Sequence, residues 1–456
     1  MNAQPSPPPI AAIILAAGKG TRMKSDLHKV LHPVAGRPML VHLIDTVASL
    51  APNKTVVVTG AGREQIEAAV APLGVLTALQ AEQLGTGHAV QQAQAALAGF
   101  SGDVLVLYGD VPLVSAATMQ RMIDRLHATD APAVVVLGFR PADTAAYGRV
   151  IADADGRIIK MVEHKDASAG ERACTLCNSG LMAARADRLF ALLDRVDNAN
   201  AAREYYLVDI VNIANADGGT CAVIETDADE VAGVNSRAEL AAVEQSWQAK
   251  RRVQAMADGA SLVAPQTVWF AFDTVIGRDV TLAPNVVFGP GVTVADGATI
   301  HAFSHITGAT IGKGAEVGPF ARLRPGTVLG TKSKVGNFVE VKKAVLGAGA
   351  KANHLSYIGD ADVGAGANIG AGTITCNYDG YFKYKTVIGD GAFIGSNSAL
   401  VAPVTIGAGA IVGAGAVVTA DVSADALALV RPSQSEKPGW ASRFRAIMTA
   451  RKAAKE

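Results

Sequence analysis

Residues 274–421 carry aliphatic side chains at intervals of six. The first run comprises Ile276, Leu282, Phe288, Val294, Ile300 and Ile306. After a slip of one residue, a second run comprises Ile311, Val317, Leu323, Leu329, Val335 and Val341, and shorter runs continue to Ile369. An irregular insertion follows, and the last run comprises Ile388, Ile394, Leu400, Ile406, Val412 and Val418. A flexible Gly/Ala-rich linker would not keep this register. The period predicts a parallel β-helix, in which each repeat forms one flat side around a narrow apolar core.

A small residue usually follows the aliphatic one, as at Gly277, Gly289, Gly312 and Gly347. Glycine permits a positive φ and a close approach between neighbouring coils. We therefore predict that these glycines form the corners of the prism.

Composition excludes several classes of protein. The formal net charge is zero, whereas nucleic-acid binding and electrostatic membrane anchoring need concentrated basic charge. No apolar run approaches the roughly 20 residues of a membrane-spanning helix, and residues 1–9 lack the pattern of a signal peptide. We expect a cytoplasmic protein with a disordered lead over residues 1–9.

Four cysteines in 456 residues do not form a disulfide framework. Cys174 and Cys177 have the C-x-x-C spacing of zinc and redox sites. No second pair accompanies them, so we interpret them as ordinary thiols in preference to a metal site.

The first apolar run, residues 10–17, has the length of a strand and ends in a glycine-rich basic turn that contains Gly18, Gly20 and Arg22. Backbone N–H groups in such a turn can face a phosphate, and Lys29 could add charge to the same anion. The turn matches neither a Walker loop nor a complete dinucleotide fingerprint. A plain strand-to-helix turn is the alternative.

Strand-like and helix-like segments alternate after this turn. Residues 55–59, 104–108 and 134–139 have the pattern of buried strands, and residues 40–50, 87–98 and 116–127 have that of amphipathic helices. The alternation predicts a mostly parallel sheet covered by helices, with ligands at the carboxyl ends of its strands. Asp110 falls at that edge, where it could hold a divalent cation against a phosphate. A solvated loop aspartate is the alternative.

A helical pattern begins at Ser236, whose spacing to Glu239 fits a capping box, and ends at about Ala257. It predicts a connecting helix. The predicted domains are residues 10–235, an α/β domain; 236–258, the linker helix; and 259–456, the β-helix with a C-terminal tail.

The run Leu15-Ala-Ala-Gly-Lys-Gly-Thr-Arg-Met23 resembles the signature of sugar-1-phosphate nucleotidyltransferases, and the ladder resembles the left-handed β-helix of hexapeptide acyltransferases. One bacterial family carries both in this order: the bifunctional N-acetylglucosamine-1-phosphate uridyltransferases and glucosamine-1-phosphate N-acetyltransferases. Further matching motifs are Gln80-Ala-Glu-Gln-Leu-Gly-Thr-Gly-His88, Tyr108-Gly-Asp-Val-Pro112, Glu163-His-Lys-Asp166, Gly318-Pro-Phe-Ala-Arg-Leu-Arg-Pro-Gly326, Gly336-Asn-Phe-Val-Glu340 and Gly370-Ala-Gly-Thr-Ile-Thr-Cys-Asn-Tyr-Asp-Gly380. The resemblance implies a Rossmann-like α/β nucleotidyltransferase domain followed by a left-handed β-helix.

For the first domain, the resemblance implies uridylyl transfer from UTP to N-acetylglucosamine 1-phosphate, with release of pyrophosphate. Arg22 and Lys29 would offset charge on the triphosphate, and Asp110 and Asn235 would hold Mg²⁺. The remaining residues implied to bind UTP or the sugar nucleotide are Leu15, Ala16, Ala17, Gly18, Gln80, Gly85, Thr86, Tyr108, Gly109, Gly148, Glu163 and Asn178.

In the ladder, Arg324 and Lys342 occupy the position after the aliphatic residue, and they lie 18 residues apart. If three repeats form one coil, as the resemblance implies, these cations stack on successive coils about 5 Å apart. Stacked like charges are unfavourable without an anion nearby, so we expect a sugar phosphate to bind there. Two side chains that splay into solvent are the alternative.

The resemblance implies that His354 is the general base for acetylation of the sugar's 2-amine, whereas a lone histidine in a β-helix is more often structural. It adds Tyr357, Asn368, Asn377 and Tyr378 as amino-sugar ligands, and Ala371, Ser396, Ala414 and Arg431 as acetyl-CoA contacts. The insertion at residues 376–385 must leave the prism as a loop. In the family, such a loop reaches a neighbouring subunit of a homotrimer.

Together these features predict an enzyme that makes UDP-N-acetylglucosamine, a precursor of peptidoglycan and lipopolysaccharide. Two alternatives stay open at this point. One is a nucleotidyltransferase for another sugar with a regulatory β-helix, and the other is a β-helical scaffold with a nucleotide-sensing head. The tail after Arg431 places its prolines differently from the family pattern, which puts its contact with coenzyme A in doubt.

Overall fold

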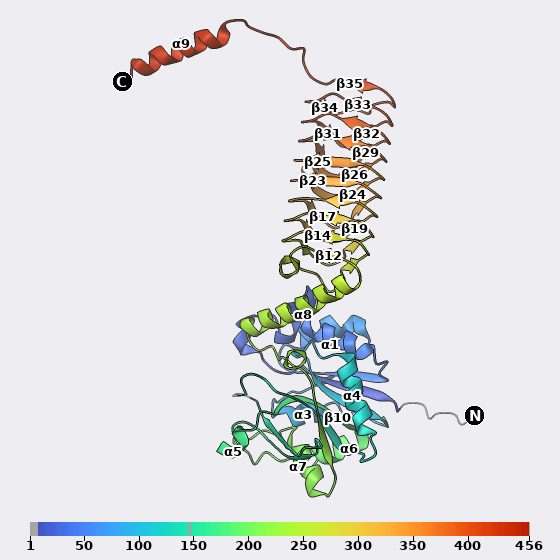
Figure 1. Ribbon diagram of the computed structural model, residues 1–456, viewed down its shortest axis with the longest axis vertical. Coiled ribbons are helices and arrows are strands. Elements are labelled where there is room, and N and C mark those ends of the chain that lie inside the picture. Colours follow the sequence, from blue (N-terminus) through green and yellow to red (C-terminus); the bar gives the residue numbers. More distant parts are fainter. Residues whose placement is uncertain (1–7, 145–146, 456) are drawn as a thin grey trace, which may run out of the picture. The chain divides into compact units, whose positions relative to one another are not determined.

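The computed structural model describes residues 8–144 and 147–455. The chain divides into two compact units, which meet between Arg251 and Arg252 (Figure 1). That division falls inside helix α8, Arg237–Ala257, so the segment predicted as a connecting helix is helical. Most of the predicted lead lies outside the described residues. Within the described residues, no helix has both the length and the apolar character needed to cross a membrane.

The first unit is built on a nine-stranded sheet whose main path runs β11-β7-β10-β6-β1-β4-β5. Its strands are β1 Ile10–Leu15, β4 Lys54–Thr59, β5 Leu76–Leu79, β6 Asp103–Tyr108, β7 Val134–Phe139, β8 Arg149–Ala152, β9 Ile158–Val162, β10 Cys177–Arg185 and β11 Cys221–Glu225. A separate small ribbon pairs β2, Pro33–Val34, with β3, Arg37–Pro38. Strand β10 runs antiparallel to β6 and β7, and the other neighbours along the main path are parallel. The predicted mostly parallel sheet is therefore confirmed.

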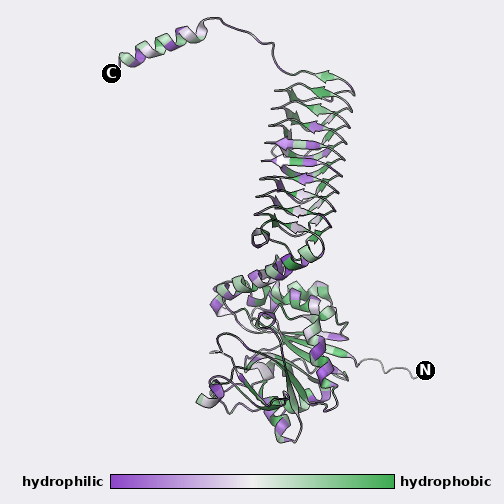
Figure 2. Ribbon diagram, viewed as in Figure 1, coloured by the Kyte–Doolittle hydropathy of each residue, from purple (hydrophilic) through white to green (hydrophobic). Residues whose placement is uncertain are grey.

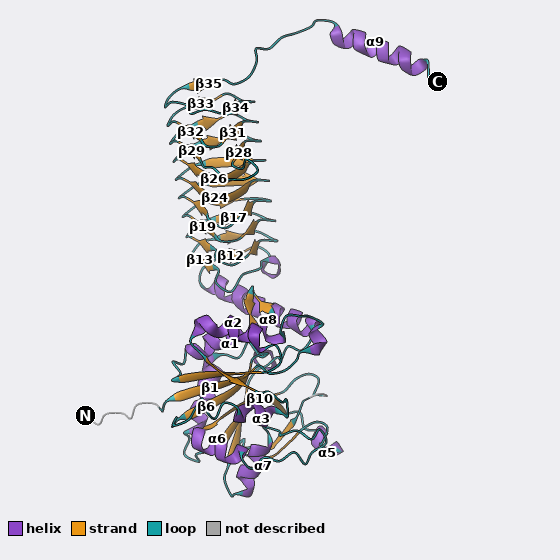
Figure 3. Ribbon diagram, turned by 180° about the vertical axis from the view of Figure 1, so that it is seen from behind, coloured by secondary structure: helices purple, strands orange, loops and turns teal. Residues whose placement is uncertain are grey.

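Helices cover both faces of this sheet (Figure 3). They are α1 Met39–Ala48, α2 Arg63–Val70, α3 Thr86–Gln91, α4 Ala116–Leu126, α5 Ala169–Arg172, α6 Ala186–Leu193 and α7 Asp209–Ala216. The predicted helix at residues 87–98 is too long. After Gln91 the chain continues as turns whose hydrogen bonds mostly join residues three apart, as in a 3-10 helix, and it reaches Gly99, which has a φ of 72°.

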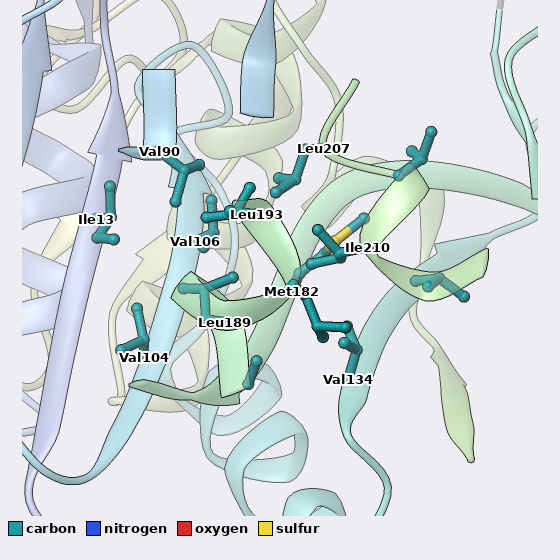
Figure 4. Close-up of a cluster of buried hydrophobic side chains, with 14 of the residues drawn as sticks. Ile13, Val90, Val104, Val106, Val134, Met182, Leu189, Leu193, Leu207 and Ile210 are labelled. Atoms are coloured by element: carbon teal, nitrogen blue, oxygen red, sulfur yellow. The ribbon is translucent and has the colours of Figure 1, made fainter. Parts of the chain in front are cut away.

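Alternate residues of β1 enter two different apolar layers. Ile13 and Leu15 pack on one side of the sheet with residues of α6 and α7, and Ile14 packs on the other side with residues of α1 and α4. Figure 4 shows the first layer, in which Leu189 and Leu193 of α6 lie near sheet residues such as Val106. Burial on both faces explains why the strands of this sheet read as continuous apolar runs.

The second unit is a parallel β-helix with three flat faces, visible as stacked strands in Figure 3. Face 1 is the ten-stranded sheet of β12 Ser261–Leu262, β14 Thr281–Leu282, β17 Thr299–Ile300, β20 Glu316–Val317, β23 Lys334–Asn337, β25 Lys351–His354, β27 Asn368–Ile369, β30 Phe393–Ile394, β33 Ile411–Val412 and β35 Leu427–Ala428. Face 2 contains β15 Val287–Phe288, β18 His305–Ile306, β21 Arg322–Leu323, β28 Ile374–Cys376, β31 Ala399–Val401 and β34 Val417–Val418. Face 3 contains β13 Val275–Ile276, β16 Thr293–Val294, β19 Ala309–Ile311, β22 Thr327–Leu329, β29 Thr386–Ile388 and β32 Val404–Ile406. The long strands β24 Glu340–Leu346 and β26 Tyr357–Val363 contribute to both of these last faces. The last helix is α9, Trp440–Ala453.

The pairing register confirms that three repeats form one coil. Thr281 pairs with Thr299, and Val287 pairs with His305, in each case 18 residues later. The side chains of the aliphatic ladder are buried, with the exception of Ile276 in the first coil, which is partly exposed. Figure 2 shows hydrophobic residues recurring along the strands of this unit.

Two reasons were predicted for the glycines after the aliphatic residues, a positive φ and a close approach between coils, and the first is wrong. A positive φ occurs two residues later, at corner positions such as Gly297, Gly314 and Gly349. The glycine directly after the aliphatic residue instead allows the backbones of two neighbouring coils to lie close together. A Cβ atom added at Gly347 would lie 2.6 Å from the backbone nitrogen of Ala365 in the next coil. Coil spacing, and not backbone angle, excludes larger residues there.

We predict that Gly347→Ala destabilises the β-helix by about 1–3 kcal/mol, because the coils cannot separate without losing backbone hydrogen bonds. Thermal unfolding followed by circular dichroism measures the effect. Gly170→Ala is the control, since an added Cβ there meets nothing within 4 Å. Equal unfolding temperatures for the two variants would contradict the close-approach explanation.

Candidate active sites

A cavity of about 390 Å³ opens at the carboxyl ends of β1 and β6. Its lining includes many of the residues predicted to bind the nucleotide: Leu15, Ala16, Ala17, Gly18, Lys29, Gln80, Gly85, Thr86, Tyr108 and Asp110. Gln83 and Glu204 also line it, although sequence reasoning assigned them no role. The Gln83 side chain donates to the backbone oxygen of Ala17 at 2.5 Å, so it links two loops of the cavity wall.

The Lys29 ammonium group joins the two residues predicted to hold a metal ion. Its Nζ atom lies 2.5 Å from Asp110 Oδ2 and 3.0 Å from Asn235 Oδ1, and the lysine side chain is 12% exposed. Gly20 makes room for this lysine, since a Cβ at Gly20 would lie 2.5 Å from Lys29 Cβ. Two oxygen atoms therefore converge on one cationic group. Such a pair fits Mg²⁺, which usually takes one or two protein oxygens together with substrate phosphates and water.

Asn235 is held in place by the start of α8. Its backbone N–H donates to Glu239 Oε2 at 2.7 Å, while Ser236 Oγ accepts from the Glu239 N–H at 3.3 Å. The predicted capping box at Ser236 is therefore only half formed, because the glutamate carboxylate reaches one residue further back along the chain. This contact fixes the backbone of the predicted metal ligand.

Gly148, Glu163 and Asn178 form a second group. The Asn178 N–H donates to the oxygen of Gly148 at 3.0 Å, and a Cβ at Gly148 would lie 3.3 Å from Glu163 Oε2. Burial, followed by Asp209, raises the pKa of Glu163. Burial and the charge of Glu163 also raise the pKa of Tyr108, which lines the nucleotide cavity. Tyr108 thus connects the two groups.

Besides Asn235 and the group of Gly148, Glu163 and Asn178, two further predicted residues lie outside the cavity lining, Arg22 and Gly109. Arg22 is exposed on the short 3-10 helix Thr21–Met23. Gly109 donates its N–H to the oxygen of Leu15 at 2.9 Å, which joins the loops that follow β6 and β1. The structure thus places Arg22 on the glycine-rich turn and Gly109 in the backbone of the cavity rim.

In the second unit, one corner of the prism aligns several predicted residues. Each lies two positions after a buried ladder residue, and the ladder residues pair in register from Ala352 through Ile369 and Ile394 to Val412. The resulting column is His354, Ala371, Ser396 and Ala414. Arg431 completes the set, because its guanidinium donates to the oxygen of Ala414. The predicted base and the predicted acetyl-CoA contacts therefore share one corner.

The cation pair predicted from the ladder lies on face 2. Leu323 pairs with Val341, which confirms that Arg324 and Lys342, the residues after them, are neighbours on successive coils. The Arg324 guanidinium lies 2.8 Å from Glu340 Oε1, so this arginine does not splay into solvent. The alternative of two splayed side chains is therefore wrong for Arg324.

Lys383 is a residue of this group that sequence reasoning missed. Its side chain contacts that of Lys342 and lowers the pKa of Lys342, as do desolvation and Arg324. Lys383 belongs to the insertion between β28 and β29, which leaves the prism as predicted. Its distance in sequence from Lys342 gave no signal, because only the folding of the insertion brings the two together.

Tyr357 and the start of the insertion extend this group. Glu340 pairs with Tyr357, and the Tyr357 hydroxyl lies over Gly359, where a Cβ would be 2.4 Å from it. Asn377 donates to Asp360, and the hydroxyl of Tyr378 donates to the oxygen of Gly380. Asn368 does not join the group, because it lies on face 1, across the corner. The predicted amino-sugar set is therefore divided between two faces of one chain.

Comparison with known proteins agrees with both units. Residues 12–162 match the model of the MobA-like NTP transferase domain, and residues 273–308 and 385–420 match that of the bacterial transferase hexapeptide (six repeats). The bifunctional protein GlmU of Sphingopyxis alaskensis is 71% identical over 98% of this chain and 99% of its own length. The chain belongs to the bifunctional GlmU family. The GlmU proteins of Novosphingobium aromaticivorans and Zymomonas mobilis are 69% and 58% identical over 98% and 96% of this chain, and over 99% and 98% of their own lengths.

The predicted family and fold class are thereby confirmed, including the left-handed β-helix of hexapeptide repeats that follows the α/β nucleotidyltransferase domain. Membership in the GlmU family excludes the two alternatives that the sequence left open. These relatives are bifunctional enzymes, and they align with nearly the whole length of this chain. It also agrees with a divalent metal ion in the nucleotidyltransferase unit.

An acidic group beside Glu163 gives a pH-dependent prediction. Burial, followed by Asp197 and Asp166, raises the pKa of Asp209 to about 6. An unfolded aspartate titrates near about 3.9, so the folded chain holds this proton more tightly, and ionisation above about pH 6 costs stability. Asp209→Asn should therefore raise the unfolding temperature of the first unit at about pH 8, and the gain should vanish towards about pH 4.

Asp217, at the other end of α7, is the matched control. Its hydrogen bond with Arg195 lowers its pKa, so its charge contributes stability above the unfolded pKa. Asp217→Asn should lower the unfolding temperature at about pH 8, opposite in sign to the Asp209 variant. Shifts of the same sign would contradict the assigned causes.

Proposed function

We propose that each of the two sites catalyses one of the two reactions of a GlmU protein. The chain acetylates glucosamine 1-phosphate with acetyl-CoA and transfers a uridylyl group from UTP to N-acetylglucosamine 1-phosphate, which yields UDP-N-acetylglucosamine. In our proposal the first unit carries out uridylyl transfer, the β-helix carries out acetylation, and both reactions take place in the cytoplasm. The domain bounds are those predicted from the sequence: residues 10–235, 236–258 and 259–456.

For uridylyl transfer, we assign the cavity at the ends of β1 and β6 to the uridine nucleotide. Gln80, Gly85 and Thr86 contact the uracil, and Gly148, Glu163 and Asn178 hold the amino sugar. The convergence of Lys29, Asp110 and Asn235 supports this assignment most directly, because phosphoryl chemistry needs positive charge at the triphosphate. The sugar phosphate oxygen attacks the α-phosphorus, and pyrophosphate leaves without a protein nucleophile.

Asp110 and Asn235 are our proposed ligands of Mg²⁺ in the loaded enzyme. The bound ion would neutralise charge on the triphosphate and on the departing pyrophosphate. In the loaded enzyme, Lys29 binds the phosphates of UTP, and Arg22 on the adjacent turn supplies a second positive charge. These side chains orient the triphosphate and stabilise the negative charge that develops during attack.

For acetylation, we assign His354 as the general base. It removes a proton from the 2-amine of the sugar, whose nitrogen attacks the thioester carbon of acetyl-CoA, and the coenzyme A thiolate leaves and takes up a proton. Arg324, Lys342 and Lys383 hold the phosphate of the sugar, and Tyr357, Asn368, Asn377 and Tyr378 surround its ring. Acetyl-CoA follows the corner past Ala371, Ser396, Ala414 and Arg431. The single observation that carries this assignment is the shared corner column that begins at His354.

Variants of the two sites should separate the activities. We expect His354→Ala to abolish acetylation, measured as free thiol released from acetyl-CoA, and to leave uridylyl transfer near normal. Asp110→Ala should do the reverse, with release of pyrophosphate as the readout. Magnesium should be required by uridylyl transfer alone. Loss of both activities in either variant would contradict the division between the two units.

We also propose that the β-helix forms a homotrimer. The support is that the residues predicted to bind the amino sugar lie on two faces of one chain, with Asn368 on one face and Lys342 on the next. If two prisms pack side by side, Asn368 of one chain can lie opposite Lys342 of its neighbour. The insertion carries Tyr381 and Phe382 at its tip, 86% and 68% exposed. Both observations agree with a site that needs a second copy of the chain.

A row of exposed aromatic side chains is a candidate for the surface between subunits of the proposed trimer. Phe303, Phe320 and Phe338 follow one another at the corner below His354, with ring centroids 5.0 and 5.2 Å apart. Each has a positive φ and is about half exposed. A neighbouring subunit that covers these half-exposed rings would bury their remaining apolar surface, which contributes about 1 kcal/mol each.

We predict that Phe320→Asn weakens the trimer and lowers acetylation, while uridylyl transfer continues. Asparagine tolerates the positive φ, as Asn285 does at the same corner two coils earlier. Lys332→Asn, at a different corner and also at positive φ, is the control. Sedimentation velocity gives the oligomeric state. A trimer of unchanged stability would show that this row lies outside the interface.

A further inference from the structure

Asn337 contacts the ring of His354. The strands β23 and β25 pair so that these two residues are direct neighbours, and the distance between Asn337 Oδ1 and His354 Nδ1 is 2.7 Å. Asn337 belongs to a motif recognised in the sequence, but no role was assigned to it there. Its spacing of 17 residues from His354, one coil with a slip, was the available signal.

The backbone around this contact is tightly held. Gly336 lies against the next coil so closely that an added Cβ would be 2.0 Å from the oxygen of Asn353. The Asn337 oxygen accepts from the Leu355 N–H at 3.0 Å, and Ser356 Oγ donates to the His354 oxygen at 2.8 Å. The backbone positions of Asn337 and His354 are therefore fixed, and the packing of the two coils brings their side chains into contact.

The chemistry of the contact selects one tautomer. An amide oxygen only accepts hydrogen bonds, so Nδ1 of the imidazole must carry the proton and Nε2 must present its lone pair. An uncharged amide does this without the attraction for a second proton that a carboxylate would exert. A base for an amine needs this neutral form with a free Nε2.

We propose that Asn337 is a positioning residue for acetyl transfer, which holds His354 in the Nδ1–H tautomer and aims Nε2 at the amine. This inference rests on the proposed role of His354 as the general base. Asn337 itself touches neither the amine nor the thioester in the reaction. Its contribution lies in the orientation and tautomer of the ring.

Three substitutions at this position test the proposal in the full-length chain. Asn337→Ala should lower the kcat of acetylation about 10- to 100-fold, the range seen when partners that orient histidines are removed, with little change in either KM. Asn337→Asp keeps an acceptor and should recover most of this kcat at high pH. Because its carboxylate favours the imidazolium, the acid limb of its pH profile should move about one unit to higher pH. Asn337→Leu, which fills the space without an acceptor, should behave like the alanine variant.

The controls separate positioning from packing. Asn353→Ala changes the residue beside His354 whose Oδ1 has no hydrogen-bond partner, and it should keep nearly normal kcat. Lys334 and Lys351, the charged residues of the paired strands, stay in every variant, so a shift in the pH profile reports on residue 337. Uridylyl transfer by the same preparations shows that the chains are folded.

The outcomes distinguish this inference from the function on which it rests. Full acetylation by His354→Ala would overturn the proposed base, whatever Asn337 does. An inactive His354→Ala beside a fully active Asn337→Ala would overturn the positioning role alone. Equal losses in Asn337→Ala and Asn353→Ala, or an unmoved acid limb in Asn337→Asp, would also overturn it, because they would indicate general loosening of the coil.

Discussion

The β-helix depends on hydrogen bonding between successive coils, whose paired residues mostly lie 17 or 18 positions apart in the chain. At many corners this pairing holds the backbones so close that the position after the buried aliphatic residue has no space for a Cβ atom, as at Gly347 and Gly364. Once the spacing is set, equivalent positions of successive coils form columns. A column can stack aromatic rings, as at Phe303, Phe320 and Phe338, or align the proposed base His354 with the proposed acetyl-CoA contacts.

The two units build their sites by different physical means. In the first, loops that leave neighbouring parallel strands meet at one edge of the sheet, and hydrogen bonds such as that between Gly109 and Leu15 join the loops. In the β-helix, most site residues sit on the strands or corners themselves, so their spacing follows from the coil. Asn377, Tyr378 and Lys383 are exceptions, because they belong to the insertion between β28 and β29, from which Lys383 reaches Lys342.

Much of the architecture could be predicted because its signals are periodic. The six-residue ladder predicted the β-helix and the departure of the insertion, and the alternating pattern predicted the sheet. The register of Arg324 and Lys342 also needed three repeats per coil, which the family resemblance implied. The roles of individual glycines were harder to predict. Glycine has two distinct uses, positive φ and close approach, and sequence alone does not show that the first falls two residues after the second.

By itself, the sequence determined the two folds, the family and most of the candidate residues, because these depend on local periodicity and on long motifs. Only the tertiary structure placed Lys29 between Asp110 and Asn235, brought Lys383 to Lys342, set Asn337 against the ring of His354 and divided Asn368 from the other residues predicted to bind the amino sugar. These relations join residues that are far apart in the chain. They depend on side-chain direction and on how loops and the insertion fold back, which no local pattern encodes.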